Sequence, residues 1–357
     1  MNPGSADVLA ERAVKRERVG RLRPAGAPGV LLTGAAAASW YLGGARVDVG
    51  AGGAPVLAVV AAPGGDTAFC LENEVERLRA EELPADVEVV TVPWFADPAA
   101  AAAEAFGPGL VGETALAVGL RAARAGLLPA ELERYRALGR DAAAALGAAL
   151  ARARPGQTEA ELASEVARAL VATGADVTVL LVAGEARAHL RHPVVGSGPL
   201  GGRAMVVVCA RRHGLIANLT RWVRFRPATA AEQRGTDGVL AVEADAFTAT
   251  VPGRPLPDVL ADIAASYPRH GFGAQEWRRH HQGGPTGYAG RDPRATPSGP
   301  DLVVDGGAFA WNPTGPGVKV EDTVVIGSSG VEVLTRAAGW PTTRVHGLDR
   351  PAELDLS

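Results

Sequence analysis

The hydrophobic pattern alternates between helical and strand periods over residues 129–326, and this alternation limits the folds that the chain can adopt. Residues 129–153 have a helical pattern that opens with Pro129. Proline suits the first helical turn because a backbone N–H there has no partner within the helix. Thr158 and Glu161 follow with the spacing of a capping box, which predicts a second helix that ends at Gly174.

Strand-like runs come next, and a second pair of helices interrupts them. The runs are short and rich in β-branched residues, which favours buried strands. They are expected at residues 177–182, 205–208, 215–220, 302–304 and 320–326, with helices at about 231–250 and 256–267. Two helices, strands, two helices and strands predict an α+β fold in which helices cover one face of a curved antiparallel sheet.

The first 125 residues predict a smaller α/β domain. Short β-rich runs bounded by glycine and proline stand at 30–33, 56–61 and 87–92, with helical patterns at 71–82, 99–106 and 115–128. A chain of 357 residues is comfortable as two domains. We therefore expect an N-terminal domain at 1–125 and a larger one at 126–357.

Composition excludes several classes of function. With 47% apolar and 21% charged residues the chain can bury a core, and its formal net charge of −3 gives no reason to expect a nucleic-acid partner. Two cysteines exclude a disulfide-rich scaffold and a thiolate zinc site. The first 23 residues lack the apolar region of a secretion signal, and no apolar run is long enough to span a membrane. We expect a cytoplasmic protein that acts on a small molecule.

Five stretches in the second domain, in the same order, resemble the creatinase/prolidase/methionine-aminopeptidase family, whose fold is known as pita-bread. They are RPGQTEAEL, GEARAHLRHPVVGSGPLGGRAMVVV, HGLIANLTRWVRF, RHHQGGPTGYAGRD and FAWNPTGPGVKVEDTVVI. The resemblance covers roughly residues 129–335. It implies a pita-bread catalytic domain, and it implies that the N-terminal domain is the accessory domain of a creatinase- or prolidase-like homodimer.

The resemblance also predicts that the metal centre of this family is missing. The metallopeptidases of the family hold two divalent ions with two aspartates, one histidine and two glutamates. Here Val207 and Asn218 match the aspartates and Asn312 matches the first glutamate, so that only His281 and Glu321 are kept. Hard divalent ions need several anionic oxygens. The sequence therefore predicts no dinuclear centre and no cofactor, and it leaves open a single transition metal on the histidines.

Creatinase, the metal-free precedent in the family, supplies the catalytic assignments. The resemblance implies that His192 transfers protons. Pro193 restricts the backbone of His192 to an extended geometry, and the ordinary pKa of a histidine side chain suits proton transfer at neutral pH. His281 and Glu321 would polarise water or the scissile group. His280 and His281 would face opposite ways in a strand, and the count from Gly284 selects His281 for the pocket.

Further residues are predicted to bind the substrate. Arg291 matches the family arginine of a Tyr-x-Gly-Arg-Glu-like run and could clamp a carboxylate. The remaining candidates are Tyr288, Asn218, Thr220, Asn312 and His280, with Arg46 expected to reach a neighbouring subunit's site. Thr220 replaces the creatinase glutamate, which argues against creatine itself.

The sequence thus favours an enzyme: a metal-independent, creatinase-like hydrolase that cleaves a C–N bond in a small polar carboxylate by acid/base catalysis. Two alternatives stay open at this point. The same pocket could perform a lyase, dehydratase or isomerase step in a specialised biosynthetic pathway, because a pocket of this kind does not dictate hydrolysis. The protein could also be a non-catalytic pseudo-peptidase that binds a partner.

Overall fold

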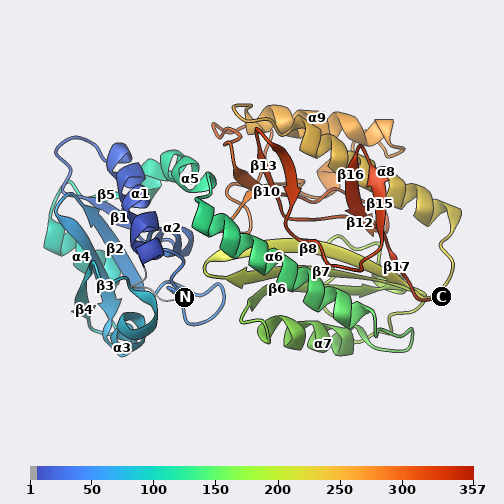
Figure 1. Ribbon diagram of the computed structural model, residues 1–357, viewed down its shortest axis with the longest axis horizontal. Coiled ribbons are helices and arrows are strands. Elements are labelled where there is room, and N and C mark those ends of the chain that lie inside the picture. Colours follow the sequence, from blue (N-terminus) through green and yellow to red (C-terminus); the bar gives the residue numbers. More distant parts are fainter. Residues whose placement is uncertain (1–5) are drawn as a thin grey trace. The chain divides into compact units, whose positions relative to one another are not determined.

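The computed structural model describes residues 6–357, and this described chain divides into two compact units (Figure 1). The first runs to Leu132 and includes the turn His213–Leu215, while the second comprises Glu133–Arg212 and Ile216–Ser357. The sequence placed the division at residues 125 and 126. None of the described helices is long and apolar enough to cross a membrane.

The N-terminal unit is built on one mixed sheet. Within the described residues its strand order is β4-β3-β2-β1-β5. The strands are β1 (Val30–Leu32), β2 (Leu57–Ala62), β3 (Gly65–Leu71), β4 (Val87–Val92) and β5 (Val111–Gly112). The helices are α1 (Ala6–Leu22), α2 (Ala35–Tyr41), α3 (Val75–Arg77), α4 (Pro98–Phe106) and α5 (Ala117–Ala125). Val60, Phe69, Val92 and Ala102 form a core between the sheet and α4, as an α/β layer requires.

The C-terminal unit has the helix pairs that the sequence predicts. They are α6 (Pro129–Leu150) with α7 (Glu159–Val171), and α8 (Ala230–Ala249) with α9 (Leu256–Arg269). The capping box of α7 is confirmed, because the Thr158 side chain accepts from the backbone of Glu161 while the Glu161 carboxylate accepts from Thr158. In Figure 1, α7 lies along β6 (Asp176–Gly184), and α8 packs on α9 at the opposite side of this unit.

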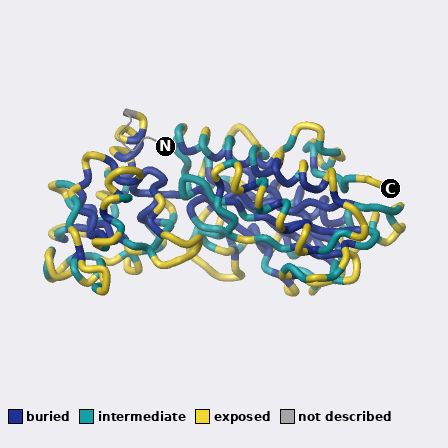
Figure 2. Tube along the Cα trace, turned by 90° about the horizontal axis from the view of Figure 1, so that it is seen from below, coloured by how far each residue is buried: buried dark blue, intermediate teal, exposed yellow. Residues whose placement is uncertain are grey.

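Two four-stranded sheets lie between these helices in the described chain. One has the order β17-β8-β7-β6, and the other has the order β14-β13-β10-β9. Their strands are β7 (Arg203–Arg212), β8 (Leu215–Arg224), β9 (Gly283–Thr286), β10 (Gly307–Trp311), β13 (Val324–Gly327), β14 (Gly330–Val333) and β17 (Leu354–Asp355). Two small hairpins complete the unit, β11 (Thr314–Gly315) with β12 (Val318–Lys319) and β15 (Thr342–Val345) with β16 (Leu348–Pro351). Figure 2 shows buried segments in the interior of the unit, and strands β7 and β8 consist mostly of buried residues. The α+β prediction is confirmed.

Two predicted strands and one predicted helix differ from the structure. Leu302 forms only an isolated bridge to Pro255, and the strand of that region is β10, further along the chain. The run 320–326 is divided, since Glu321 forms an isolated bridge to Thr220 and regular pairing begins at β13. The helical pattern 71–82 is broken into three short helical turns after β3, a strand that the sequence did not predict.

A buried ion network anchors the segment between β12 and β13. Arg221 donates to Asp322 (2.7 Å) and to the Thr335 carbonyl (2.6 Å). Arg350 donates to the other Asp322 oxygen (2.7 Å) and to Glu243 (2.5 Å). All four charged side chains are almost completely buried. These contacts make Arg221 a structural arginine of the sheet.

Candidate active site

Strands β7 and β8 place a row of side chains on one face of their sheet. Because successive side chains alternate between the faces of a strand, Val207 and Cys209 share one face of β7, while Asn218 and Thr220 share one face of β8. The charges of Glu321 and Arg291 act on Cys209, so this face belongs to the candidate site. Burial raises the pKa of Cys209 to about 12, so that its thiol stays protonated and unreactive.

Glu321 reaches this face through the bridge to β8. The Thr220 backbone N–H donates to the Glu321 carbonyl (2.9 Å), and the Thr220 hydroxyl lies 3.4 Å from the Glu321 carboxylate. Arg291 forms an ion pair with the same carboxylate. The side chain of Glu321 is 2% exposed, and a carboxylate so deeply buried needs such a partner. In this structure Arg291 therefore pairs with Glu321, whereas the sequence analysis expected it to bind a carboxylate of the substrate.

The turn that carries Arg291 depends on a glycine. Gly283 starts β9 with a φ of 99°, and a Cβ there would lie 2.1 Å from the Ala310 carbonyl oxygen. No side chain fits so close to the neighbouring strand β10. The turn after β9 is closed by the Asp292 N–H, which donates to the Pro285 carbonyl at 2.8 Å. This turn brings Arg291 back toward Glu321.

Three histidines from two loops meet beside these residues. The ring centroids of His192 and His280 lie 4.6 Å apart, and those of His280 and His281 lie 4.4 Å apart in a stacked pair. The prediction that only one of His280 and His281 lines the pocket is wrong. The two residues follow a short 3-10 helix (Glu276–Arg279) and precede β9, so the alternation of a strand does not apply to them.

The hydrogen bonds within this group fix the protons on two of the rings. His280 Nδ1 donates to the His281 carbonyl at 2.5 Å, which leaves His280 Nε2 as an acceptor. His192 Nε2 lies 3.1 Å from that atom and must be its donor. The lone pair of His192 is then on Nδ1, on an exposed residue. His192 thus has the free nitrogen that a general base requires.

All three imidazoles are held neutral. Burial lowers the pKa of His280 to about 2 and the pKa of His281 to about 3. Burial also lowers the pKa of His192, and the charge of Lys319 lowers it further, while Glu321 acts in the opposite direction. The charges of Arg291 and Arg294 add to the effect on His281. At neutral pH all three rings are therefore uncharged.

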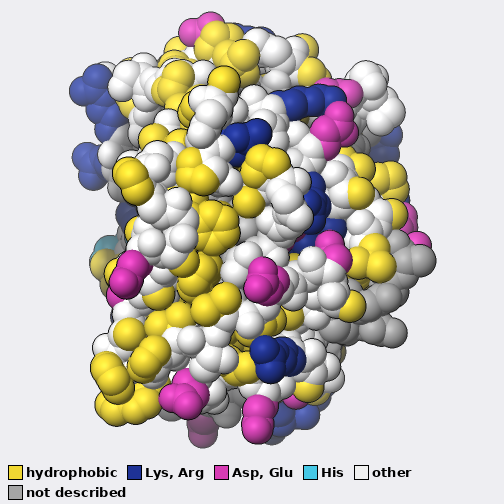
Figure 3. Space-filling view, turned by 90° about the vertical axis from the view of Figure 1, so that its left-hand side faces the viewer, with side chains coloured by type: hydrophobic (Ala, Val, Ile, Leu, Met, Phe, Trp, Pro, Cys, Tyr) yellow, Lys and Arg dark blue, Asp and Glu magenta, His cyan; other side chains and the backbone are white. Residues whose placement is uncertain are grey.

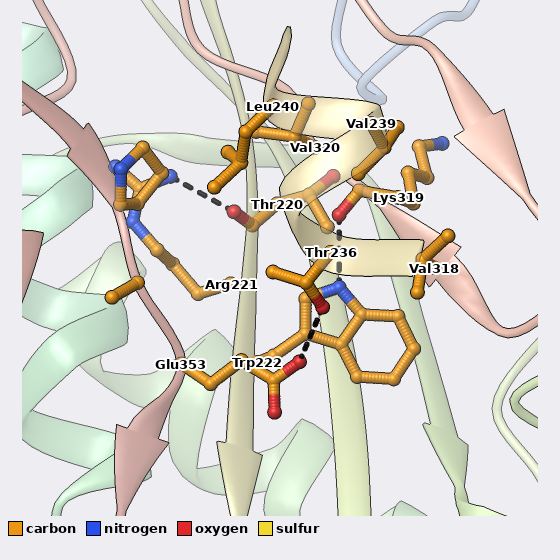
Figure 4. Close-up of a pocket in the computed structure, with 12 residues that line it drawn as sticks. Thr220, Arg221, Trp222, Thr236, Val239, Leu240, Val318, Lys319, Val320 and Glu353 are labelled. Carbon is orange, nitrogen blue, oxygen red and sulfur yellow. Dashed lines mark hydrogen bonds between the residues drawn. The ribbon is translucent and has the colours of Figure 1, made fainter. Parts of the chain in front are cut away.

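Lys319 is the residue of this site that the sequence analysis missed. Its side chain is 4% exposed, and Nζ lies 3.9 Å from Glu321. Its position two residues before Glu321 could have identified it, because side chains at i and i+2 share a face in an extended segment. Figure 4 shows the backbone of Lys319 at a neighbouring pocket, where Trp222 Nε1 donates to its carbonyl (2.9 Å), and shows its side chain extending away from Trp222 and Glu353.

The other predicted residues differ in where they lie. Asn218 and Asn312 are 0% and 2% exposed, and each has a buried Oδ1 without a partner. Tyr288 is also buried, in the turn that follows β9. Arg46 lies in the N-terminal unit, where its backbone and side chain both donate to Glu82. Its placement at a neighbouring subunit's site stays a prediction.

The residues present do not fit a pair of divalent ions. Val207 offers no ligand, Asn218 and Asn312 offer neutral oxygens, and the Glu321 carboxylate is paired with Arg291. One nitrogen from each of His192, His280 and His281 could reach a common ion, since these ligand atoms lie within 4.8 Å of one another. The positive charges of Lys319, Arg291 and Arg294 that act on these rings disfavour a cation there.

Comparison with known proteins identifies relatives of the whole chain. The model of metallopeptidase family M24 matches residues 133–328, more than half of the chain. Dipeptidase PepE from Mycobacterium ulcerans has a TM-score of 0.74 and 22% identity, with 99% of this chain and 98% of that one covered. The Xaa-Pro dipeptidase from Bacillus anthracis has a TM-score of 0.73 and 17% identity, with 98% and 100% covered.

The prolidase from Pyrococcus horikoshii OT3 is similar as well, with a TM-score of 0.72 and 17% identity, over 94% of this chain and 100% of that one. No curated protein matches significantly by sequence. At these identities the likeness to solved structures establishes the fold. The pita-bread fold and the family resemblance predicted from the sequence are both confirmed.

The neutral histidines predict how stability depends on pH. A histidine whose pKa is lower in the folded state than its ordinary 6.5 binds fewer protons than in the unfolded chain, so its contribution to stability is lost as the pH falls below 6.5. For His280, which faces Lys319, His192 and His281, the loss is about 1 kcal/mol at pH 5.5.

Urea unfolding at pH 7.5 and 5.5 should show a smaller loss for His280→Asn than for the unmodified protein. His189→Asn, at an exposed position, is the control and should lose as much stability as the unmodified protein. Equal losses in His280→Asn and the unmodified protein would contradict the neutral assignment.

Proposed function

The chain belongs to metallopeptidase family M24, and from that membership we propose that it is a metal-independent hydrolase that cleaves a C–N bond in a small, carboxylate-bearing molecule. The observation that carries the proposal is a group of three neutral imidazoles close to Glu321 and Arg291, in a site where Val207, Asn218 and Asn312 stand at the positions that the resemblance assigns to metal-binding carboxylates. Such a group can transfer protons at neutral pH and does not need a metal to produce a base.

The proposed reaction is an addition of water followed by loss of the amine. His192 Nδ1 accepts a proton from the attacking water, and the water oxygen bonds to the carbon of the scissile bond. The C–N bond then breaks, and His192 returns the proton to the leaving nitrogen. His280 orients His192 through the 3.1 Å contact between their Nε2 atoms. Glu321 is held by Arg291, so its carboxylate can orient the water without turning.

The His192–His280 contact also favours a second candidate of a different class. Two imidazoles in hydrogen-bond contact can move a proton between two positions of one substrate, as a lyase, dehydratase or isomerase of a biosynthetic pathway requires. Turnover in ¹⁸O-labelled water separates the candidates. A hydrolase incorporates the label into its product, and an isomerase does not.

Replacing the proposed base should remove most of the activity. His192→Ala should lower kcat by roughly 10²–10⁴-fold, the range for the loss of a general base, and Glu321→Gln should cause a comparable loss because it keeps the shape and removes the charge. The assay is steady-state turnover of a substrate found by screening amide and peptide carboxylates. His189→Ala, an exposed histidine of the same loop, is the control. Near-normal turnover in His192→Ala would move the proton transfer to another residue, and activity in none of the variants or the unmodified protein would favour a pseudo-peptidase.

Metal analysis tests the other part of the proposal. The purified protein should contain well below one equivalent of divalent metal by elemental analysis, and chelator treatment should leave turnover unchanged. The physical reason is the loss of anionic ligands at Val207, Asn218 and Asn312. Two tightly bound ions per chain would overturn the metal-independent reading. A single ion per chain that is absent from His280→Ala would show that the three imidazoles form a metal site.

We also propose that the protein is a homodimer, as the creatinase-like resemblance implies. Figure 3 shows a face of the N-terminal unit on which apolar side chains are grouped between isolated charged ones. In this unit Trp94 and Phe95 are 67% and 75% exposed, and such an aromatic pair is typical of an interface. Light scattering at micromolar concentration should give twice the chain mass of 36.5 kDa. Trp94→Ser with Phe95→Ser should shift the equilibrium toward monomer, and a monomeric unmodified protein would contradict the proposal.

A further inference from the structure

Several polar groups of this site have no partner, and together they specify the charge of the molecule that would satisfy them. We infer that the substrate is an N-acylated amino acid, with carbamoyl counted among the acyl groups: a carboxylate anion whose scissile nitrogen is an uncharged amide or ureide N–H. Lys319 is the residue that binds the carboxylate. The inference rests on the proposed cleavage of a C–N bond and adds the class of molecule that is cleaved.

Lys319 is a buried cation without a hydrogen bond. Among residues 6–357 its ammonium group makes no hydrogen bond, and its one ion-pair partner is the Glu321 carboxylate at 3.9 Å, which is beyond hydrogen-bond distance. An ammonium group has three N–H donors, and Lys319 gives none of them to an acceptor of the described chain. The Lys319 side chain also extends away from Glu353, the carboxylate of the neighbouring pocket (Figure 4). An anion bound beside Glu321 would supply the missing acceptors.

Arg291 has a free donor in the same place. One of its terminal nitrogens pairs with Glu321 and the other donates to the Gly290 carbonyl, while Nε is buried and has no partner. The Glu321 charge is thereby neutralised. The charges that still act on the histidines have a positive excess, which comes from Lys319 and from the exposed Arg294. Charge complementarity favours an anion in this position.

Two amide oxygens identify the nitrogen of the substrate. Asn218 Nδ2 donates to the Thr286 hydroxyl (3.0 Å) and to the Ile216 carbonyl (3.3 Å). Because the Thr286 hydroxyl donates its own proton to the Ala289 carbonyl, the Asn218 amide cannot be reversed. Its Oδ1 is therefore an acceptor without a donor, and Asn312 Oδ1 is a second one.

Neutral acceptors of this kind suit an uncharged N–H. An ammonium or guanidinium group would need a carboxylate to leave water, and the carboxylate at this site, Glu321, is already paired with Arg291. Asn218, Asn312 and Thr220 cannot replace it. A zwitterion such as creatine, or a dipeptide with a free amino terminus, would therefore leave its positive charge unpaired. The amide N–H of an N-acylated amino acid needs one neutral acceptor.

The reaction balances without another reagent. Water adds to the acyl carbon and gives one proton to His192. The bond between that carbon and the amide nitrogen breaks, and the nitrogen leaves with the proton from His192. The products are a free amino acid and a carboxylic acid, which ionises; a carbamoyl substrate gives carbamic acid in its place, which breaks down to carbon dioxide and ammonia.

Binding of matched probes tests the inference apart from turnover. Calorimetry with His192→Ala, which should bind without cleaving, compares N-acetyl and N-carbamoyl amino acids with two zwitterions, glycylglycine and creatine. The N-acylated probes should bind at least tenfold more tightly than the zwitterions. Lys319→Met should weaken their binding 10- to 100-fold, Lys319→Arg should keep part of it, and Arg344→Met, an exposed arginine, should leave it unchanged.

A charge added to the site gives a second, independent test. Asn218→Asp keeps the size of the side chain and places a carboxylate at the amide position. It should weaken the N-acylated probes and strengthen the zwitterions, so that their ratio of affinities falls or reverses. Thermal unfolding of each variant shows that it is folded, and Lys319→Met should be no less stable than the parent because it removes a buried charge.

The outcomes separate this inference from the proposed function. Zwitterions that bind as tightly as the N-acylated probes, unchanged affinity in Lys319→Met, or no binding by any N-acylated probe would each overturn the inference. Cleavage of a zwitterion would support the proposed hydrolase and contradict the inference that its substrate is N-acylated. Tight binding of N-acylated probes without cleavage by the unmodified protein would support the inferred ligand class and contradict the proposed hydrolase.

Discussion

The antiparallel bridge between Thr220 and Glu321 is the contact on which the site depends, because it connects the sheet of β8 to the segment that leads into β13. At this bridge consecutive residues face opposite ways. Glu321 faces the histidines and Arg291, and Asp322 faces the buried Arg221 and Arg350. Removing one member of such a network would leave charges buried without partners, which is strongly unfavourable. The network behind the bridge therefore holds the catalytic face in register.

The same geometry controls the electrostatics in front of the bridge. Lys319 and Glu321 share a face because they are two residues apart, and Arg291 returns from the turn after β9 to pair with the carboxylate. The remaining positive charge keeps the three imidazoles neutral, together with their burial. A neutral His192 has a lone pair that can accept a proton from substrate or water, whereas an imidazolium ion could only donate one. The local fold and the charge distribution of the candidate site therefore both depend on a short extended segment.

Local chemistry explains which features the sequence could predict. The capping box at Thr158 and Glu161 and the helix opening at Pro129 depend on neighbours in the chain, and both are confirmed. The sequence analysis selected His192, Glu321 and Arg291 as candidates because they lie in motifs that follow one another in the order of the family. The stacking of His280 on His281 was not predicted, because strand alternation was applied to residues outside a strand. Lys319 was missed because the absence of a partner is a property of the folded site, and β3 was missed because its Gly65–Leu71 segment begins with polar residues.

Membership of family M24 and the chemistry of the site are separate conclusions, since a fold hosts many reactions. Carboxylates at the positions of Asn218 and Asn312 would make this face attractive to cations. With amides there, and with Lys319 and Arg291 opposite a single carboxylate, the face attracts an anion. The backbone need not move for this change, because Asn and Asp have nearly the same shape. If the proposed function holds, a few substitutions on an unchanged scaffold turn a site for metal ions into a site for an anionic amide.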